Sequence, residues 1–447
     1  MNTRLTQTQS ESPDLLIVGA STRAAAASAR RAGYRPLCVD QYGDQDLHAL
    51  AAVIPRTSEP DGWLRVLAAY SSLEWIYTGG MENQRELISQ ISERHRLRGC
   101  GPDSLQRVRD PFFVEQLISG HPICMAPCLP IDAHPADPEN WLCKPLRSAA
   151  GLGIRLLNSP QPDSQDAQGC YLQRYQPGQP LSALFIAFPE AVVLVGLALQ
   201  FCGNPVLGAR GFQYCGGVTI SPVTDRLRST LEDLGTTLAQ GCGIQGLFGC
   251  DLIWHSSERD RLWLTEVNPR YTALTELFEL QYRLPLLAWH LGACRSFHGD
   301  PTRYGSPAEL QNQLVESIKQ SFPQIAKGIL YARQDRCAPD IPLPEMQRDL
   351  FAVPESADLP YPGTSIPGGT PFCSVYGTGR NQRESLKVLS DRLRTYQMLL
   401  APEGVPERAA ADLLTSLLDS TEQENHFFSC FFSSEAEGNS FLEESPH

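Results

Sequence analysis

Two short apolar segments carry three oxygen-bearing side chains that could hold a metal ion. Asp251 lies in the segment 246–254, and Glu266 and Asn268 lie in the next one, 261–268. Side chains alternate between the two faces of a strand, so Glu266 and Asn268 share a face. Carboxylate and amide oxygens on neighbouring strands suit Mg²⁺, which takes one or two carboxylates together with substrate phosphates. We therefore predict that these three residues are metal ligands, with Mg²⁺ as the ion and Mn²⁺ as the alternative.

A lysine followed by a loop of small residues indicates a site for phosphate groups. Lys144 is the only lysine in the first two thirds of the chain, which otherwise uses arginine for its positive charges. The loop 147–153 contains Ser148, Gly151 and Gly153, and the backbone N–H groups of such residues approach phosphate oxygens closely. The Walker motif GxxxxGK[ST] is absent from the sequence. We predict that Lys144 is a cation for phosphates and that the loop folds over them; a ligand-free hairpin of small residues is the alternative.

Four further polar side chains are candidates for contacts with a substrate. For each of them a purely structural role is the alternative. Gln173 and Tyr175 end a predicted strand, where they could contact an adenine base or form only a turn. Arg210 could hold a phosphoryl group or a substrate carboxylate, or be an ordinary hairpin arginine. Glu276 could act on an amine substrate as a base or an anchor, or be an acidic residue that favours the start of a helix.

The opening segment predicts the first domain that would support such a site. A short apolar strand, 14–19, precedes an alanine-rich helix, 24–32, and a second strand, 36–40. This order is typical of a dinucleotide-binding fold, but the glycine fingerprint GxGxxG is absent. We therefore predict a Rossmann-like accessory domain, in which residues 21–23 could hold a substrate anion at the start of the helix. An NAD or FAD site is the less favoured alternative.

Length, charge and apolar content exclude several classes of protein. A chain of 447 residues is longer than one hydrophobic core usually serves, so we expect two or three domains. Its net charge of −13 argues against nucleic acid as a partner. The longest apolar run, 191–201, is too short to cross a membrane, and the polar N-terminus does not resemble an export signal. We expect a cytoplasmic protein with reduced cysteines, small-molecule ligands and no membrane partner; a homo-oligomer is left open.

The order of these segments resembles the ATP-grasp superfamily over about residues 105–280. The resemblance rests on Lys-Pro at 144–145, the small-residue loop, the strand ending near Tyr175, and the segment Glu-Val-Asn-Pro-Arg at 266–270. It implies a mixed α+β and α/β fold, in which two α+β lobes clamp ATP after a Rossmann-like pre-ATP-grasp domain and before a small β-rich C-terminal domain. The expected divisions are 1–104, 105–300 and 301–420, followed by a mobile acidic tail at 421–447.

The resemblance also implies roles for single residues. Lys144 would contact the nucleotide phosphates, and Arg270 matches the family arginine that binds the transferred phosphoryl group or acyl-phosphate. Arg109 is the only stand-in for a lysine that the family usually has in its smaller lobe. The acidic residue that usually holds the ribose is missing, and Pro180 and Ser182 stand there instead.

Within the superfamily, the chain resembles predicted carboligases that are distantly similar to biotin carboxylase, also through the segment 369–375. This implies a Mg-ATP-dependent ligase that joins a carboxylate to an amine through an acyl-phosphate and releases ADP. Some relatives of this type join glutamate to tyrosine or tyramine in a methanofuran-like cofactor of tetrahydromethanopterin-linked one-carbon metabolism. The alternatives are a bicarbonate-dependent carboxylase like biotin carboxylase, and a catalytically degenerate nucleotide-binding scaffold.

Overall fold

The computed structural model describes residues 12–57, 59–159, 169–255, 261–320, 322–343 and 349–400. The predicted acidic tail at 421–447 lies outside these residues, as does the last part, 401–420, of the predicted C-terminal domain. In the described part of the chain, none of the helices is long and apolar enough to cross a membrane.

The N-terminal residues form a parallel sheet covered by helices. Its elements are the strands β1 (Leu15–Val18), β2 (Pro36–Asp40), β3 (Ala52–Pro55), β4 (Glu74–Tyr77) and β5 (Arg96–Leu97), and the helices α1 (Arg23–Arg31), α2 (Gln45–His48), α3 (Pro60–Leu67) and α4 (Arg85–Ser92). The spatial order β3-β2-β1-β4-β5 is that of a doubly wound sheet. β1 and β2 are buried throughout, as expected for a parallel sheet with helices on its faces. The carboxyl ends of β1, β2 and β4 therefore lie side by side at one edge.

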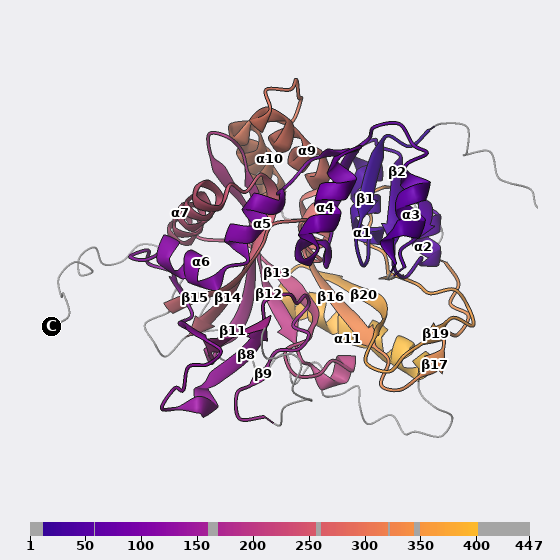
Figure 1. The fold of residues 1–447 in the computed structure, drawn as a ribbon. Coiled ribbons are helices and arrows are strands. Elements are labelled where there is room, and N and C mark those ends of the chain that lie inside the picture. Colours follow the sequence, from indigo (N-terminus) through magenta and orange to yellow (C-terminus); the bar gives the residue numbers. More distant parts are fainter. Residues whose placement is uncertain are drawn as a thin grey trace, which may run out of the picture.

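A nine-stranded, largely antiparallel sheet runs through the rest of the described chain (Figure 1). In spatial order its strands are β18 (Ser356–Ala357), β20 (Pro371–Gly379), β16 (Gln324–Tyr331), β13 (Tyr214–Ile220), β12 (Val192–Cys202), β11 (Gln179–Ala187), β14 (Gly246–His255), β15 (Arg261–Asn268) and β6 (Cys124–Met125). β16, β18 and β20 fall in the segment predicted as a C-terminal domain. They extend the large sheet through the pairing of β16 with β13, instead of forming a sheet of their own.

Two groups of helices cover the two faces of the large sheet. Leucines of α7 (Asp225–Cys242) and α11 (Gln382–Leu400) belong to one core cluster, and those of α8 (Thr275–Tyr282), α9 (Leu286–Phe297) and α10 (Pro307–Lys319) belong to another. The strands alternate accordingly: in β11, Phe185 joins the first cluster, while Leu184 and Ile186 join the second. Ala25 and Ala29 of α1 also join the second cluster, so the N-terminal unit packs against α8 and α9.

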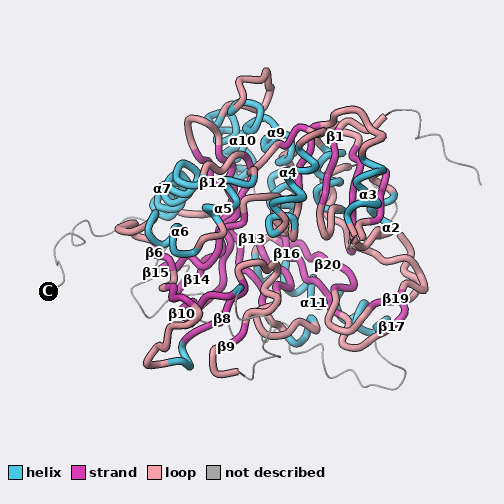
Figure 2. Tube along the Cα trace, viewed as in Figure 1, coloured by secondary structure: helices cyan, strands magenta, loops and turns pink. Residues whose placement is uncertain are grey.

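A small four-stranded sheet lies beside the large one and forms a second lobe (Figure 2). Its strands, in spatial order, are β7 (Cys128–Pro130), β10 (Cys170–Arg174), β8 (Trp141–Pro145) and β9 (Arg155–Leu156). The helices α5 (Pro102–Val108) and α6 (Pro111–Leu117) precede it. Trp141, Cys143 and Leu172 form a hydrophobic cluster of their own in this lobe, which leaves Lys144 and Gln173 on the opposite face, toward β15. A separate two-stranded sheet joins β17 (Arg336–Cys337) to β19 (Ser365–Ile366).

Candidate active site

Asp251, Glu266 and Asn268 come together where β14 pairs with β15. The register places Asp251 opposite Glu266 and Gly249 opposite Asn268, with a bulge after Asp251. Asn268 Nδ2 donates a hydrogen bond to Asp251 Oδ2 at 2.9 Å. The three side chains predicted as metal ligands are therefore neighbours on two adjacent strands.

Two carboxylates share this part of the site, and their repulsion contributes to a raised pKa of one of them. Burial, and then the charge of Glu266, raise the pKa of Asp251 to about 6. Gln200 Nε2, from β12, donates to Asp251 Oδ1 at 2.6 Å and favours the ionised form. A cation between the carboxylates would remove the repulsion, so this set of oxygens fits a hard divalent ion such as Mg²⁺. The sequence prediction omits Gln200, although it is the only amide side chain in the apolar strand β12.

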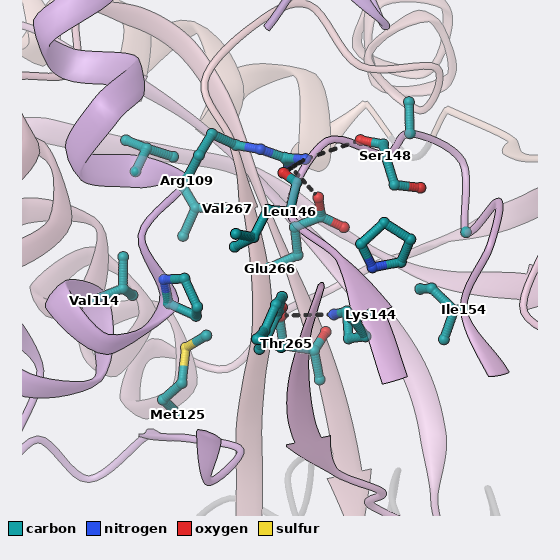
Figure 3. A pocket seen from close by; sticks show the side chains of 16 residues that line it. Arg109, Val114, Met125, Lys144, Leu146, Ser148, Ile154, Thr265, Glu266 and Val267 are labelled. Carbon is teal, nitrogen blue, oxygen red and sulfur yellow. Dashed lines mark hydrogen bonds and ion pairs between the residues drawn. The ribbon is translucent and has the colours of Figure 1, made fainter. Parts of the chain in front are cut away.

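Lys144 enters the site from the end of β8. Its Nζ donates to Gln173 Oε1 at 2.9 Å. It also donates to the carbonyl oxygen of Thr265 at 3.2 Å (Figure 3). Burial lowers the pKa of Lys144, and the charge of Glu266 offsets this only in part. An ammonium group has three N–H donors, of which these two contacts use two. One donor therefore remains for an anionic ligand such as a phosphate.

Arg109, predicted as the stand-in for a lysine of the smaller lobe, binds both Glu266 and the small-residue loop. Its Nη1 donates to Glu266 Oε1 at 2.5 Å, and its Nη2 donates to the carbonyl oxygens of Leu146 and Ser148 at 3.0 and 2.9 Å (Figure 3). Burial alone would raise the pKa of Glu266, but the charges of Arg109 and Lys144 hold it below its ordinary value. Glu266 is therefore ionised, as a metal ligand must be.

Arg270 connects the end of β15 to the N-terminal unit. Its Nε donates to Glu82 Oε1 at 2.8 Å, and its Nη2 donates to Asn268 Oδ1 at 3.1 Å. Glu82 lies in the short helix η1 (Met81–Asn83) and is 2% exposed. The sequence prediction omits Glu82, because no local pattern reveals a partner so far along the chain. The guanidinium group also lies beside Gly79, so the N-terminal unit forms one wall of the site.

The loop predicted to cover phosphates is held by hydrogen bonds from β13 on one side and from η1 on the other. Tyr214 N, in β13, donates to the carbonyl oxygen of Ala150 at 3.0 Å. Asn83 Nδ2, in η1, donates to the carbonyl oxygen of Ser148 at 3.1 Å. The Ser148 hydroxyl is bonded to the carbonyl oxygen of Leu152 and closes the loop on itself. The loop thus lies between the small lobe, the N-terminal unit and the large sheet.

Glycine is required within this loop at the positions that the sequence prediction names. Gly151 and Gly153 have φ values of +74° and +77°, in the region that side chains rarely adopt. A Cβ atom on Gly151 would lie 1.9 Å from the carbonyl oxygen of Phe212. The loop can therefore approach the large sheet this closely only without a side chain at Gly151.

Gln173 and Tyr175, the predicted adenine contacts, have different surroundings. Gln173 is buried, and its oxygen already accepts the hydrogen bond from Lys144. Its Nε2 donates to the carbonyl oxygen of Thr265 at 3.3 Å, so the side chain positions Lys144 against β15. Tyr175 is 40% exposed, and its ring meets that of Phe212 edge to face at 6.3 Å between centroids. Of the two residues, Tyr175 is the one that presents a free surface to a planar ligand.

A cavity of about 740 Å³ joins these groups. Tyr175 and Phe212 line one part of it, and Asp251, Glu266 and Arg270 line another. Its wall continues to residues 41, 42 and 44 of the N-terminal unit and to residues 327 and 358 near the C-terminal strands. A smaller pocket of about 40 Å³ lies between Arg109, Lys144 and Glu266 (Figure 3). The larger cavity has the size of a site for a nucleotide together with a small substrate.

The structure does not bring Arg210 or Glu276 into this site. Arg210 is exposed, and its Nη2 lies 3.5 Å from the carbonyl oxygen of Arg333. Glu276 is fully buried and accepts hydrogen bonds from Arg23, Lys327 and the hydroxyl group of Tyr376. Neither residue lines the two cavities described above. Arg210 matches its alternative reading, an ordinary hairpin arginine.

Glu276 takes part in buried ion pairs, which make it a weak base. Burial opposes its charge, but Arg23 and Lys327 outweigh burial and hold the pKa of Glu276 far below its ordinary value. These contacts tie α8 to α1 and β16, so Glu276 joins three parts of the fold. The sequence could not separate this role from catalysis, because both place an acidic residue at the start of a helix.

Glu276→Gln is expected to destabilise the protein by about 3–5 kcal/mol, because it leaves Arg23 and Lys327 buried without their shared carboxylate. Thermal and urea unfolding would measure the loss, with the exposed Glu316→Gln as the matched control. An unchanged unfolding transition would contradict the structural role given to Glu276.

Comparison with known proteins gives the class of this site. Residues 110–274 match the family model for an ATP-grasp domain. A search of curated proteins finds no significant match. The pyruvate carboxylase of Rhizobium etli aligns with a TM-score of 0.65 and 13% identity, over 97% of this chain and 40% of that chain. The biotin carboxylase of Campylobacter jejuni aligns with a TM-score of 0.61 and 12% identity, over 93% of this chain and 97% of that chain. The N5-carboxyaminoimidazole ribonucleotide synthetase of Thermus thermophilus aligns with a TM-score of 0.56 and 15% identity, over 88% of this chain and 100% of that chain.

The fold is thus that of the ATP-grasp enzymes, with the overall arrangement of biotin carboxylase. Residues 110–274 of the chain thus match an ATP-grasp domain. Lys144, Asp251 and Glu266 lie within the segment that matches the family, and Arg109 lies just before it. The TM-scores of 0.61 and 0.56 show the shared fold, and the identities of 12% and 15% leave the substrates open.

Proposed function

We propose that the chain is a Mg-ATP-dependent ligase that joins a carboxylate to an amine and releases ADP and phosphate. One observation carries the proposal: Asp251, Glu266 and Arg270 line the same 740 Å³ cavity as Lys144, in a chain whose residues 110–274 match an ATP-grasp domain. Carboxylates that can hold Mg²⁺, opposite cations that can hold phosphate oxygens, are what phosphoryl transfer from ATP needs.

In the first step, a carboxylate oxygen of the acid attacks the γ-phosphorus of ATP, and the bond from that phosphorus to the ADP oxygen breaks. Mg²⁺, when bound by Asp251, Glu266 and Asn268, would neutralise charge on the phosphate oxygens. Lys144 would use its remaining N–H donor on the phosphates. Arg270 would hold the transferred group, since Glu82 and Asn268 fix its guanidinium group at the other side of the cavity.

In the second step, the amine nitrogen attacks the acyl carbon of the acyl-phosphate, and the bond from that carbon to the phosphate oxygen breaks. An amide and phosphate are formed, and the nitrogen gives up a proton to solvent. No side chain near Arg270 is assigned as base, since Glu276 lies outside the cavity. The loop 147–153 supports both steps by excluding water from the phosphates, because hydrolysis would waste the acyl-phosphate.

Two other functions have specific support. A bicarbonate-dependent carboxylase is favoured by the overall likeness to biotin carboxylase, which covers 93% of this chain. A degenerate nucleotide-binding scaffold is favoured by the ion pair of Arg109 with Glu266, since an arginine at 2.5 Å competes with a metal ion for the same carboxylate. In the ligase reading, glutamate as the acid and tyrosine or tyramine as the amine are the first pair to test.

Purified protein with Mg-ATP and a panel of acids and amines would test the proposal. The panel contains glutamate, other small carboxylates, bicarbonate, tyrosine and tyramine, and ADP, AMP and phosphate are measured. Each acid is also tested with hydroxylamine, a small neutral nucleophile that converts an acyl-phosphate into a hydroxamate. ADP and hydroxamate formed with one acid would support the ligase. ADP formed with bicarbonate alone would favour the carboxylase, and ATP binding without any turnover would favour the scaffold.

Gly151→Ala is expected to raise the KM for ATP about tenfold, because strain of 1–3 kcal/mol at a positive φ moves the loop away from Phe212. Gly363→Ala is the matched control, since Gly363 has a φ of +79° with nothing within 4 Å of an added Cβ. Equal KM values for ATP in the wild type and Gly151→Ala would show that the loop does not close on the nucleotide.

A further inference from the structure

The side chain of Asp44 is a buried carboxylate without a partner. Asp44 is 7% exposed and lines the 740 Å³ cavity. It precedes α2 but makes no capping hydrogen bond, and among the described residues no donor or cation contacts its side chain. Burying an ionised carboxylate without a partner is costly, so such a group in a cavity wall indicates a missing ligand.

The neighbouring carboxylates on the same unit, Asp40 and Asp46, accept hydrogen bonds from groups within the protein. Asp40 accepts hydrogen bonds from the backbone and hydroxyl of Thr22 at 2.6 and 2.8 Å, and from two backbone N–H groups of the following turn at 2.8 Å. Asp46 accepts from the backbone N–H groups of Asp358 and Leu359 at 2.8 and 3.0 Å. Asp44 therefore differs from the acidic residues on either side of it.

The cations near Asp44 are already engaged elsewhere. Arg23 contacts Glu276, Asp358 and Asp46, with the last two at 2.9 and 3.5 Å. Lys327 lies 3.3 Å from Glu276 and 3.9 Å from Asp358. These two cations thus serve three carboxylates, and Asp44 adds a fourth. With all four carboxylates ionised, the group has two more negative than positive charges, which a proton on Asp44 or a cationic ligand from the cavity would offset.

The surroundings of Asp44 disfavour the ionised form of its carboxyl group. Burial, and then the charges of Asp358, Asp46 and Asp40, raise the pKa of Asp44 to about 8, while Arg23 lowers it only in part. A cationic group of a ligand would relieve this penalty.

A series of backbone contacts connects the part of the cavity wall at Asp44 with Arg270. Gly79 adjoins the guanidinium group of Arg270, and its carbonyl oxygen accepts a hydrogen bond from Ala20 N at 3.1 Å. The carbonyl oxygen of Ala20 accepts in turn from Gln41 N at 3.2 Å. Gln41, Tyr42 and Asp44 then continue the cavity wall. The wall at Asp44 and Arg270 therefore belong to the same cavity.

We propose that Asp44 binds the ammonium group of the amine substrate, which makes that substrate a small primary amine that enters as a cation and loses a proton to solvent before its nitrogen attacks. The proposal rests on the ligase function for the statement that this cation is the amine substrate. A primary ammonium has three N–H donors, of which the carboxylate of Asp44 takes one or two. The apolar side chains of Ala24 and Ala25 in the same wall leave room for the carbon chain of such a molecule.

Isothermal titration of the full chain loaded with Mg-ADP would test the proposal. Tyramine and 1,4-diaminobutane are the cationic probes, and 4-ethylphenol is the neutral counterpart of tyramine. Asp44→Asn is expected to weaken binding of the cationic probes about 30-fold, the usual effect of removing the charged acceptor of a hydrogen-bonded ion pair. Asp61→Asn, an exposed change in the same unit, is the matched control and should bind them like the wild type.

Two outcomes would overturn the proposal. One is equal affinity of the cationic probes for the wild type and Asp44→Asn, with both proteins showing cooperative thermal unfolding. The other is that neither cationic probe binds the wild type more tightly than 4-ethylphenol does. Since binding to the Mg-ADP form requires no turnover, these results are distinct from a failure of the ligase function, which would show as absence of ADP and hydroxamate.

Discussion

Glu266→Gln is expected to lower ATP turnover at least about a thousand-fold while the protein stays folded. Glu266 lies opposite Asp251 in the register of β14 and β15, and it is kept ionised by Arg109 and Lys144. Glutamine has nearly the same shape but no charge, so it cannot neutralise Mg²⁺. The substitution would leave Arg109 and Lys144 in place while removing the second carboxylate of the predicted metal site.

Steady-state ADP release with the best acid and amine would measure this effect. Glu86→Gln, an exposed change on α4, is the matched control. Circular dichroism and thermal unfolding would show whether the variant keeps its fold, because Glu266 also takes part in an ion pair. Turnover within about threefold of the wild type would remove Glu266 from the metal site.

Lys144→Ala is expected to weaken the affinity for ATP about 30- to 100-fold, as is usual for loss of a charge-assisted hydrogen bond in a buried site. Lys144 is 7% exposed and is fixed by Gln173 and Thr265 with one N–H donor left. Lys144→Arg is not expected to restore affinity, since a planar guanidinium group is larger than the ammonium group that this position accommodates.

Equilibrium titration with Mg-ATP would measure the dissociation constants of these variants. Lys319→Ala is the matched control, because Lys319 is an exposed lysine whose contact is with Glu316 on its own helix. An unchanged dissociation constant in Lys144→Ala would mean that this lysine does not contact the nucleotide.

Gln173→Leu should also weaken the affinity for ATP, but less than Lys144→Ala, since Gln173 holds the ammonium group in place.

The sequence was sufficient to predict the parts of the site that lie close together along the chain. Glu266 and Asn268 are two residues apart, and strand periodicity alone puts them on one face. Asp251 joins them because a short connection makes β14 and β15 neighbours in an antiparallel pair. The conformation of the loop was also predictable in kind, since small residues in sequence indicate a backbone that must approach something closely.

The remaining site residues depend on contacts that no local pattern encodes. Glu82 fixes Arg270 across 188 positions of sequence, and Gln200 contacts Asp251 across 51. Glu276 shows the reverse case, in which an acidic residue near the motif is turned away into an ion pair with Arg23. Asp44 differs from Asp40 and Asp46 only in the folded structure, where those two residues accept hydrogen bonds within the protein. For Glu82, Glu276 and Asp44 the packing of the N-terminal unit against the large sheet decides the role, whereas Gln200 and Asp251 meet within that sheet.

The pairing of β16 with β13 makes the predicted C-terminal domain continuous with the large sheet. β16 pairs with β13 through Gly216, where a Cβ atom would lie 2.1 Å from the carbonyl oxygen of Lys327. A glycine within a strand signals such a close approach but does not say which strand approaches. The consequence for function is that Lys327, carried by β16, reaches the cavity wall next to Asp358.

Transfer of an oxygen label from the acid to phosphate tests the central claim most directly. The acid that supports ADP formation would be prepared with ¹⁸O in its carboxylate and incubated with Mg-ATP, the amine and the protein, and the phosphate would be analysed by mass spectrometry. An acyl-phosphate intermediate predicts one ¹⁸O atom in each phosphate released, because the carboxylate oxygen that attacks phosphorus leaves with it. Phosphate without the label, or AMP and pyrophosphate in place of ADP and phosphate, would contradict the account.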